Sequence, residues 1–545
     1  MFTVPNLLCA ALSVGIYSLG ASAWRESNVV DLGYVKYRGN VNASFPNTVS
    51  YLGIPYAEPP LGNLRFRAPV PLNKIRVSAE ARGEVVDATE YPEFCVQGST
   101  SGEAGGAGSE DCLKVNVYAP EGAKPGDDLP VLFYIHGGGY IYGNPAAFPF
   151  EHWISQSPNV IIVSVYYRLD SFGFLAVPEF SNPLIGDFNA GFQDQTQALR
   201  WVQENIWAFG GDPSRVTING ESAGGGSVEF HLVATDQEGL FSGAIAQSVY
   251  RSYTITPEQM QPLFDFYSDA AGCGTGSVPE KVNCLRNATV SALARAQDMA
   301  SSSFNGSYNI FIPIADGKII TGPPTLSLEK GEFWKVPVIV GSTSNESVVY
   351  SGSVSDGVGG LWPGLTQDDL QEFEEEYPLS DFDDAIQQVS TATGEPLFRC
   401  APPIIANATS KTHKAWIYRF DQPNPTLNVS FDIGVAHAAE NWFEFRGTNT
   451  GFNGTFALSE FTPVETAFSE EMIAYWLSFV RSGDPNTYKL DQSPVWEEYV
   501  PETRARIVLH QGKSTDVSGS SMEAIPEKEA GRCAFVASKA AHMLT

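Results

Sequence analysis

Short apolar runs bounded by turn residues alternate with helical patterns through the first half of the chain. The run VLFYIH ends at His136 and VIIVSVYY ends at Tyr167, and both are continuously apolar, as in strands buried on both faces. QDQTQALRWVQENI has apolar residues at helical spacing and is followed by Gly-Gly-Asp-Pro, which predicts a helix that ends there. The series of predicted strands continues with VTING, AIAQS, VPVIVGS and AWIYRF. This alternation predicts an α/β fold with a mostly parallel sheet and crossover helices.

The second half of the chain holds longer and less regular segments. We interpret them as helical insertions from the same core, because no linker separates them from the first half. The sequence therefore predicts one α/β domain over residues 24–545, with a large central sheet, helices on both of its faces and long helical insertions.

The N-terminus carries an apolar stretch from Leu7 to about Ala21, followed by a small-x-small site that ends at Ala23. We interpret residues 1–23 as a signal peptide and expect a secreted, extracellular protein. No Lys or Arg precedes the stretch, so a membrane anchor is the competing interpretation. Ser13, Ser18 and two glycines leave the stretch short of the roughly 20 apolar residues that a span requires, so we expect no stable membrane insertion.

Cysteine content and glycosylation motifs favour the same export route. Removal of a signal peptide with Cys9 leaves six cysteines, an even number. Candidate N-glycosylation sites are Asn42, Asn287, Asn305, Asn407, Asn428 and Asn453. Asn345 also begins a sequon, but we expect no glycan there because it adjoins a candidate catalytic residue.

Overall composition restricts the possible partners. The chain is 43% hydrophobic and 17% charged, as in a folded globular protein, and its formal net charge is −29. Such a charge repels nucleic acids and anionic membranes. We expect a small-molecule or lipid substrate, no nucleic-acid partner, and a monomer or homodimer.

A candidate nucleophile follows the predicted strand VTING. Gly220-Glu221-Ser222-Ala223-Gly224 is a G-x-S-x-G motif, and the next residues can form a helix. A serine on such a tight turn has a strained backbone, and only very small residues two positions away leave room for the bend. The chain has 51 glycines, so a chance match is the alternative, but the motif occurs once and follows a strand.

The segment His136-Gly137-Gly138-Gly139 also follows a predicted strand. Acyl transfer requires N–H donors directed at the oxyanion of the tetrahedral intermediate, and glycines let backbone amides approach a substrate closely. We assign the oxyanion hole to the N–H groups of Gly138, Gly139 and Ala223. No metal or cofactor is needed for this chemistry.

A serine nucleophile requires a histidine base and a carboxylate that orients it, in the order Ser, acid, His. The histidines after Ser222 are His231, His413, His437, His510 and His542. We favour His437, which lies among small residues well past AWIYRF. For the acid we favour Glu346, just beyond VPVIVGS, because sites in open α/β sheets gather past the carboxyl ends of strands. Asp316, Asp421 and Asp432 stay open as rivals.

Several segments, in order along nearly the whole mature chain, resemble the type-B carboxylesterase or cholinesterase-like family of the α/β-hydrolase fold. They are LGIPYAEPPLGNLRFRAP, SEDCLKVNVYAP, IHGGGYIYG, YYRLDSFGFL, GFQDQTQALRWVQENIWAFGGDP, TINGESAGGGS, IPIADGKI and GVAHAAE. By this resemblance Glu346 is the acid and His437 the base of a triad with Ser222. The resemblance also implies a carboxylic ester hydrolase.

The resemblance implies further roles. Glu221, Ser248 and Glu440 support the triad, and Asp316 is structural. Arg65 and Glu110 form a structural ion pair. The implied disulfides are Cys95–Cys112, Cys273–Cys284 and Cys400–Cys533, one of 15 possible pairings.

Departures from the family pattern bear on the substrate. In cholinesterases the loop closed by the first disulfide is longer and carries a tryptophan that binds quaternary ammonium groups. Here the loop between Cys95 and Cys112 has no aromatic residue and is short, glycine-rich and acidic. We therefore favour a soluble-ester esterase over a choline esterase or over a triglyceride lipase or sterol esterase with a long lid. A non-catalytic adhesion module is a further alternative, which the intact triad disfavours.

Overall fold

The computed structural model describes residues 28–97, 108–304, 310–347, 349–423, 434–450, 456–458 and 460–545. The predicted signal peptide lies outside these residues, as do Asn305, Asn428, Asn453 and Asp432.

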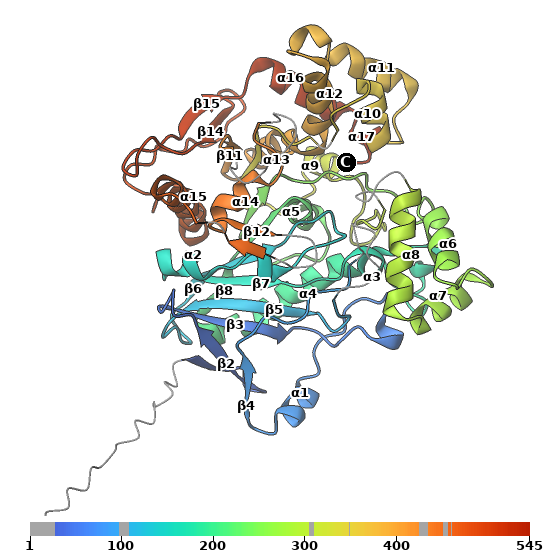
Figure 1. Cartoon of the computed structure of the whole chain (residues 1–545), viewed down its shortest axis with the longest axis vertical. Coiled ribbons are helices and arrows are strands. Elements are labelled where there is room, and N and C mark those ends of the chain that lie inside the picture. Colours follow the sequence, from blue (N-terminus) through green and yellow to red (C-terminus); the bar gives the residue numbers. More distant parts are fainter. Residues whose placement is uncertain are drawn as a thin grey trace, which may run out of the picture.

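A thirteen-stranded sheet forms the centre of the protein (Figure 1). Its strands follow the order β1-β2-β3-β5-β7-β6-β8-β9-β10-β11-β14-β15, and β4 pairs with β2. The run from β7 to β14 is parallel throughout, whereas β1, β3, β5 and β15 join by antiparallel pairing. The predicted parallel sheet is thus confirmed for the centre, and antiparallel strands extend both of its edges.

The strand bounds are β1 Val29–Asp31, β2 Lys36–Val41, β3 Thr48–Pro55, β4 Val85–Ala88, β5 Lys114–Pro120, β6 Leu129–Ile135, β7 Ile161–Val165, β8 Gly211–Glu221, β9 Gly243–Gln247, β10 Val338–Thr343, β11 Ala415–Phe420, β14 Ala505–Leu509 and β15 Ser521–Ala524. A separate two-stranded sheet consists of β12 Thr448–Thr450 and β13 Phe456–Leu458.

Helices surround the sheet. Their bounds are α1 Lys74–Ala81, α2 Glu151–Gln156, α3 Asp170–Phe174, α4 Ala190–Asn205, α5 Ala223–Val233, α6 Gln261–Ala270, α7 Val278–Asn287, α8 Val290–Ser303, α9 Pro324–Lys330, α10 Val354–Leu361, α11 Gln367–Glu376, α12 Ala385–Gly394, α13 Ala401–Thr409, α14 Ala439–Glu444, α15 Pro463–Ser482, α16 Glu527–Ser538 and α17 Ala540–Met543. Within the described ranges, every helix is too short or too polar to cross a membrane.

Alternate side chains of a single strand pack on opposite faces of the sheet. In β6, Val131, Phe133 and Ile135 belong to one buried cluster, and Leu132 and Tyr134 belong to the other. The period of two follows from the strand geometry, and burial of both faces explains why the sequence of this strand is continuously apolar. Helices α4, α5 and α13 pack into the first cluster, and α2, α14 and α15 pack into the second.

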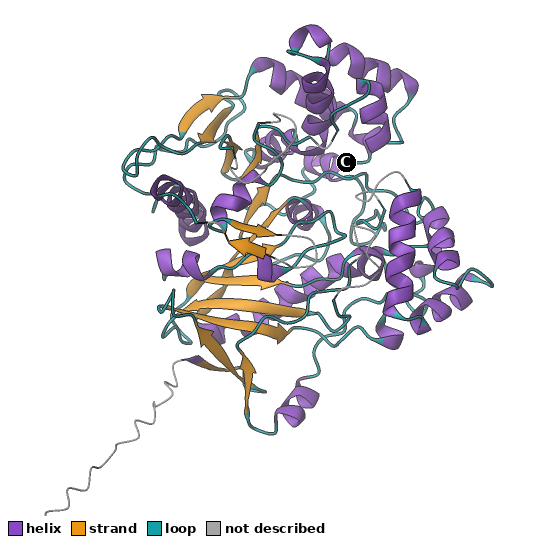
Figure 2. Ribbon diagram, in the orientation of Figure 1, coloured by secondary structure: helices purple, strands orange, loops and turns teal. Residues whose placement is uncertain are grey.

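The predicted helical insertions form two groups beside the sheet. Helices α6, α7 and α8 follow β9, and helices α10, α11 and α12 follow β10 (Figure 2). Helix α11 carries a run of acidic residues, of which Asp369 is buried and accepts a hydrogen bond from Lys539 Nζ. Each insertion thus starts at the carboxyl end of a central strand and extends away from it.

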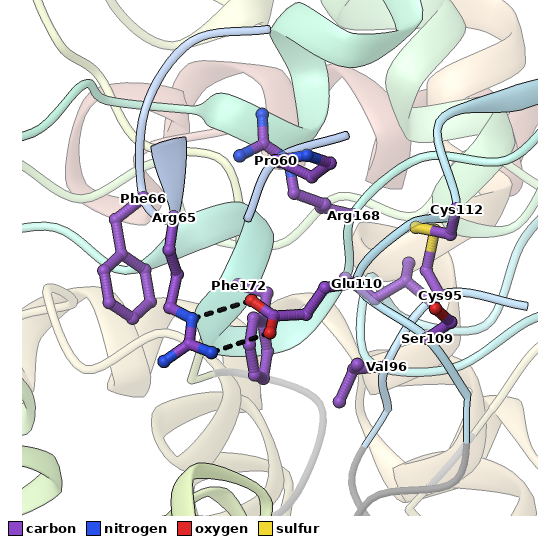
Figure 3. A pocket seen from close by; sticks show the side chains of 11 residues that line it. Pro60, Arg65, Phe66, Cys95, Val96, Ser109, Glu110, Cys112, Arg168 and Phe172 are labelled. Atoms are coloured by element: carbon purple, nitrogen blue, oxygen red, sulfur yellow. Dashed lines mark hydrogen bonds and ion pairs between the residues drawn. A yellow bond between two sulfur atoms is a disulfide. The ribbon is translucent and has the colours of Figure 1, made fainter. Parts of the chain in front are cut away.

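A buried ion pair and a disulfide lie side by side near α7 (Figure 3). Arg65 donates from Nε and Nη2 to the two carboxylate oxygens of Glu110, at 2.7 and 2.6 Å. Its Nη1 donates to the carbonyls of Leu285 and Ala288. The guanidinium therefore ties the N-terminal segment to the end of α7.

Three disulfides are present, in the pairing that the resemblance implies. They join Cys95 to Cys112, Cys273 to Cys284, and Cys400 to Cys533.

Candidate active site

Ser222 occupies the sharp turn between β8 and α5. Its backbone angles are φ 59° and ψ −123°, a strained conformation that non-glycine residues rarely adopt. A Cβ atom added to Gly224 would lie 2.0 Å from the carbonyl oxygen of Ile135, so only glycine fits at this position. The turn raises the serine side chain above the carboxyl edge of the sheet.

Four adjacent strands contribute to this edge because they run parallel in the order β6, β8, β9 and β10. Residues 136–139, called the glycine loop below, follow β6. Ser222 follows β8, Ser248 follows β9, and Glu346 lies three residues beyond β10. His437 lies two residues before α14. The topology thus assembles residues that are separated by up to about 300 positions in the sequence.

Ser222, His437 and Glu346 form a continuous hydrogen-bonded chain. His437 Nε2 lies 2.8 Å from Ser222 Oγ, and His437 Nδ1 lies 2.5 Å from Glu346 Oε2. Both distances permit proton transfer or charge-assisted hydrogen bonding. The geometry allows the imidazole to accept the serine proton while the carboxylate fixes its orientation.

The loop that carries Glu346 is held on both sides. Glu346 Oε1 accepts hydrogen bonds from the backbone N–H of Thr343 and from Ser248 Oγ, each at 2.6 Å. The N–H of Asn345 donates to the carbonyl of Val435, which lies two residues before His437. These contacts connect the loop of the predicted acid to the loop of the predicted base.

The other candidates lie elsewhere. His231 is buried between Gln195 and Gln237, and Asp316 accepts the N–H groups of residues 318–320 in a turn. Asp421 pairs with Arg419. The structure therefore brings none of these three to Ser222 by a hydrogen bond in the part of the chain that it describes.

The glycine loop forms a tight turn beside Ser222. Gly138 has φ +105°, and a Cβ atom there would lie 2.1 Å from the carbonyl oxygen of Tyr142. Within the described part of the chain, no hydrogen-bond partner occupies the N–H groups of Gly138, Gly139 or Ala223. These amides are free to donate to a ligand.

Nearby carboxylates control the protonation of His437. Burial alone would lower its pKa, but the carboxylate of Glu346 raises the pKa above the usual 6.5, and Glu221 and Glu440 raise it further when they are ionised. Burial would raise the pKa of Glu346, but the charge of His437 and hydrogen bonds from His437, Ser248 and Thr343 lower it. The geometry therefore favours a carboxylate at Glu346 and a basic imidazole at His437.

Three further glutamates are buried close to this pair. Glu221 accepts from Asn441 Nδ2 at 3.0 Å and lies 3.5 Å from His437 Nε2. Burial, followed by repulsion from Glu346 and Glu221, raises the pKa of Glu440 to about 8. Burial and the neighbouring Glu440 raise the pKa of Glu444 well above its usual value. The site therefore holds more carboxyl groups than it can keep ionised at neutral pH.

Some residues of this site carry no recognisable motif. The ring of Phe398 packs against His437 from the π-helical turn Glu395–Arg399, and Thr343 supports Glu346 only through its backbone. Glu444 Oε1 accepts a hydrogen bond from Gln247 Nε2 at 2.6 Å. In the sequence, Glu440 and Glu444 are four positions apart. This spacing indicates that the two glutamates share one face of a helix.

The model of the carboxylesterase family matches residues 26–529. The chain belongs to the carboxylesterase family. Among its relatives, para-nitrobenzyl esterase of Bacillus subtilis is 32% identical, over 86% of this chain and 93% of that protein. Acetylcholinesterase of Bungarus fasciatus is 30% identical, over 83% of this chain and 77% of that protein.

The crystal structure of EstA from Aspergillus niger superposes on this carboxylesterase with a TM-score of 0.82 and 31% identity, covering 95% of this chain and 99% of that one. Lipase 5 of Diutina rugosa matches over a shorter range, at 34% identity over 55% of this chain and 59% of the lipase. Membership of the family and these relatives identify the protein as a carboxylic ester hydrolase.

Proposed function

We propose that this carboxylesterase is a secreted serine esterase that uses Ser222 as nucleophile, His437 as general base and acid, and Glu346 as the orienting carboxylate. One observation carries the proposal: His437 lies within hydrogen-bond distance of both partners, at 2.8 Å from Ser222 Oγ and 2.5 Å from Glu346 Oε2. This is the geometry that a serine nucleophile requires.

In the proposed reaction, Ser222 Oγ attacks the ester carbonyl while His437 Nε2 takes its proton. The N–H groups of Gly138, Gly139 and Ala223 donate to the oxyanion as negative charge develops on the carbonyl oxygen. The imidazolium then protonates the departing alcohol, which leaves an acyl-enzyme. Water, deprotonated by His437, releases the acid and restores Ser222.

Soluble esters are the proposed substrates. The loop between Cys95 and Cys112 spans 17 positions and contains no aromatic residue, so it offers neither an aromatic site for quaternary ammonium nor a long apolar lid. The similarity to a yeast lipase makes a triglyceride lipase or sterol esterase the second candidate. A lipase would show a jump in activity once a triglyceride emulsion forms.

Export is the proposed route to the extracellular space. It is supported by the apolar N-terminal stretch, by three disulfides, and by the exposure of two sequons. Asn287 and Asn407 are exposed, and Asn42 is half-buried. These three are the described positions at which we propose glycans.

The experiment that tests the proposed function compares turnover of p-nitrophenyl esters, from acetate to palmitate, by the wild-type protein and by Ser222→Ala. The variant should lose activity by a factor on the order of 10⁶, because the nucleophile is absent while the fold is unchanged. Equal activity of the two proteins would refute the role of Ser222. Labelling of the folded protein by an organophosphate would separate the esterase from a non-catalytic adhesion module.

A further inference from the structure

The Ser248 hydroxyl lies between two buried carboxyl groups. Ser248 Oγ is 2.6 Å from Glu346 Oε1 and 3.0 Å from Glu440 Oε1, and all three side chains are fully buried. A hydroxyl carries one hydrogen, so it can donate to one of these oxygens and must accept from the other. An ionised carboxylate can only accept. One of the two carboxyl groups therefore holds a proton.

The contacts of Glu346 are those of a carboxylate. Its Oε1 accepts from the N–H of Thr343, and its Oε2 faces His437 Nδ1. With the Ser248 hydroxyl as a further donor, each oxygen has a hydrogen-bond donor directed at it. A proton on Glu346 would displace one of these donors.

The contacts of Glu440 are those of a neutral acid. Its Oε1 lies near Ser248 Oγ and 3.3 Å from the hydroxyl of Tyr418. Its Oε2 is buried, and no partner reaches it in the described part of the chain. A buried charged oxygen without a partner costs much more free energy than an uncharged carbonyl oxygen.

The groups that face Glu440 also disfavour its ionisation. Glu440 is surrounded by the carboxyl groups of Glu346, Glu221 and Glu444. The neighbour that can carry a positive charge is His437. Among the described residues, neither Glu440 nor Glu444 pairs with a lysine or an arginine. A second carboxylate beside Glu346 would lie in an environment that is already negative.

We propose that Glu440 is a protonated positioning residue, which donates its hydrogen to Ser248 so that the Ser248 hydroxyl donates to Glu346. This inference rests on the proposed roles of Glu346 and His437. With the proton on Glu440, donors converge on Glu346 from two sides: Ser248 Oγ donates to Oε1 and His437 Nδ1 donates to Oε2. It also limits the negative charge near His437, which keeps the imidazole able to lose its proton and act as a base.

Substitutions at Glu440 distinguish a proton donor from an anion. The amide of Glu440→Gln can donate to Ser248 as the protonated acid does, whereas Glu440→Ala leaves Ser248 without that donor. We expect kcat of Glu440→Gln to stay within about twofold of wild type and kcat of Glu440→Ala to fall by about tenfold. In the pH profile of kcat/KM, the midpoint of the acidic limb of Glu440→Gln should equal that of the wild type or lie at lower pH.

A matched control is Glu471→Gln, since Glu471 is another buried glutamate that accepts from a serine, Ser518, at 2.7 Å. This variant should change neither kcat nor the pH profile. Equal losses of kcat in Glu440→Gln and Glu440→Ala would overturn the proposal, because they would show that the charge of Glu440 is needed.

Infrared difference spectroscopy tests the proton without any turnover. A protonated carboxyl group has a C=O stretch that a carboxylate lacks. In a Ser222→Ala background at neutral pH, the spectrum should lose one such band when Glu440 is replaced by Gln. An unchanged carboxylic-acid region would overturn the protonation of Glu440. Failure of the proposed esterase function would appear separately, as equal ester turnover by Ser222→Ala and wild type.

Discussion

The ring of Phe398 lies against the imidazole of His437, with 4.3 Å between the ring centroids and 33° between the planes. Phe398 is 2% exposed and belongs to the π-helical turn Glu395–Arg399, which interrupts the helical segment between α12 and α13. Such turns often occur at functional sites, because they redirect a side chain within a helix. The imidazole is thus held by Glu346 at Nδ1 and by an aromatic ring at its face.

Replacement of Phe398 by leucine should lower kcat by about tenfold with a smaller change in KM, because a loosened imidazole spends less time aligned with Ser222. Steady-state kinetics with p-nitrophenyl acetate, together with the melting temperature, measures both effects. Phe373→Leu is the control, since Phe373 is an equally buried ring on α11. If both variants lose stability but neither loses kcat, the contact is only structural.

The acidic limb of the pH profile should report His437. Because nearby carboxylates raise the pKa of His437, activity should increase with pH through a midpoint above the 6.5 of a free imidazole. The sign follows because the base is active only when deprotonated. Glu346→Gln should move this midpoint to lower pH and reduce kcat by a factor on the order of 10⁴. A midpoint that does not move would argue against the contact between Glu346 and His437.

Gly138→Ala tests the proposed oxyanion hole. The added Cβ would collide with the carbonyl of Tyr142, and the positive φ disfavours alanine, so the N–H groups should turn away from the substrate. We expect kcat to fall by about 10²- to 10³-fold. Gly122→Ala introduces a similar backbone strain at φ +83° with nothing within 4 Å. Comparable losses of kcat in the two variants would show that strain alone is responsible.

Glu110→Gln should destabilise the protein without a matching loss of kcat. Arg65 and Glu110 are 7% and 10% exposed, and loss of one partner leaves a buried charge, at a cost of about 3–5 kcal/mol. Glu204→Gln breaks the exposed pair with Lys74 and should cost less than about 1 kcal/mol. Thermal unfolding of both variants provides the comparison. Equal decreases in melting temperature in the two variants would mean that the buried ion pair contributes no more stability than the exposed one.

The sequence was sufficient to predict the features that follow from local pattern. Continuous apolar runs predicted the parallel strands, and the two glycines around Ser222 predicted the strand-to-helix turn, because both depend on near neighbours in the chain. The choice of Glu346 over Asp316 and Asp421 needed the family resemblance. Composition and spacing alone do not show which carboxylate the folded chain brings to His437.

Other features depend on contacts between distant segments. Phe398 and His437 come from different segments of the chain, and the π-helical turn that carries Phe398 has no sequence motif. The direction of the hydrogen bond at Ser248 depends on distances to two carboxyl groups at once. The antiparallel strands at the edges of the sheet, such as β15, were likewise not predicted, because short polar strands lack a distinctive pattern.

The most direct test of the central claim is to locate the residue that a fluorophosphonate modifies. Wild-type protein should be labelled with one-to-one stoichiometry, and peptide mass spectrometry should place the adduct on Ser222. His437→Ala should be labelled far more slowly, because the serine has lost its base. An adduct on a different serine, or equal labelling rates in wild type and His437→Ala, would contradict the account.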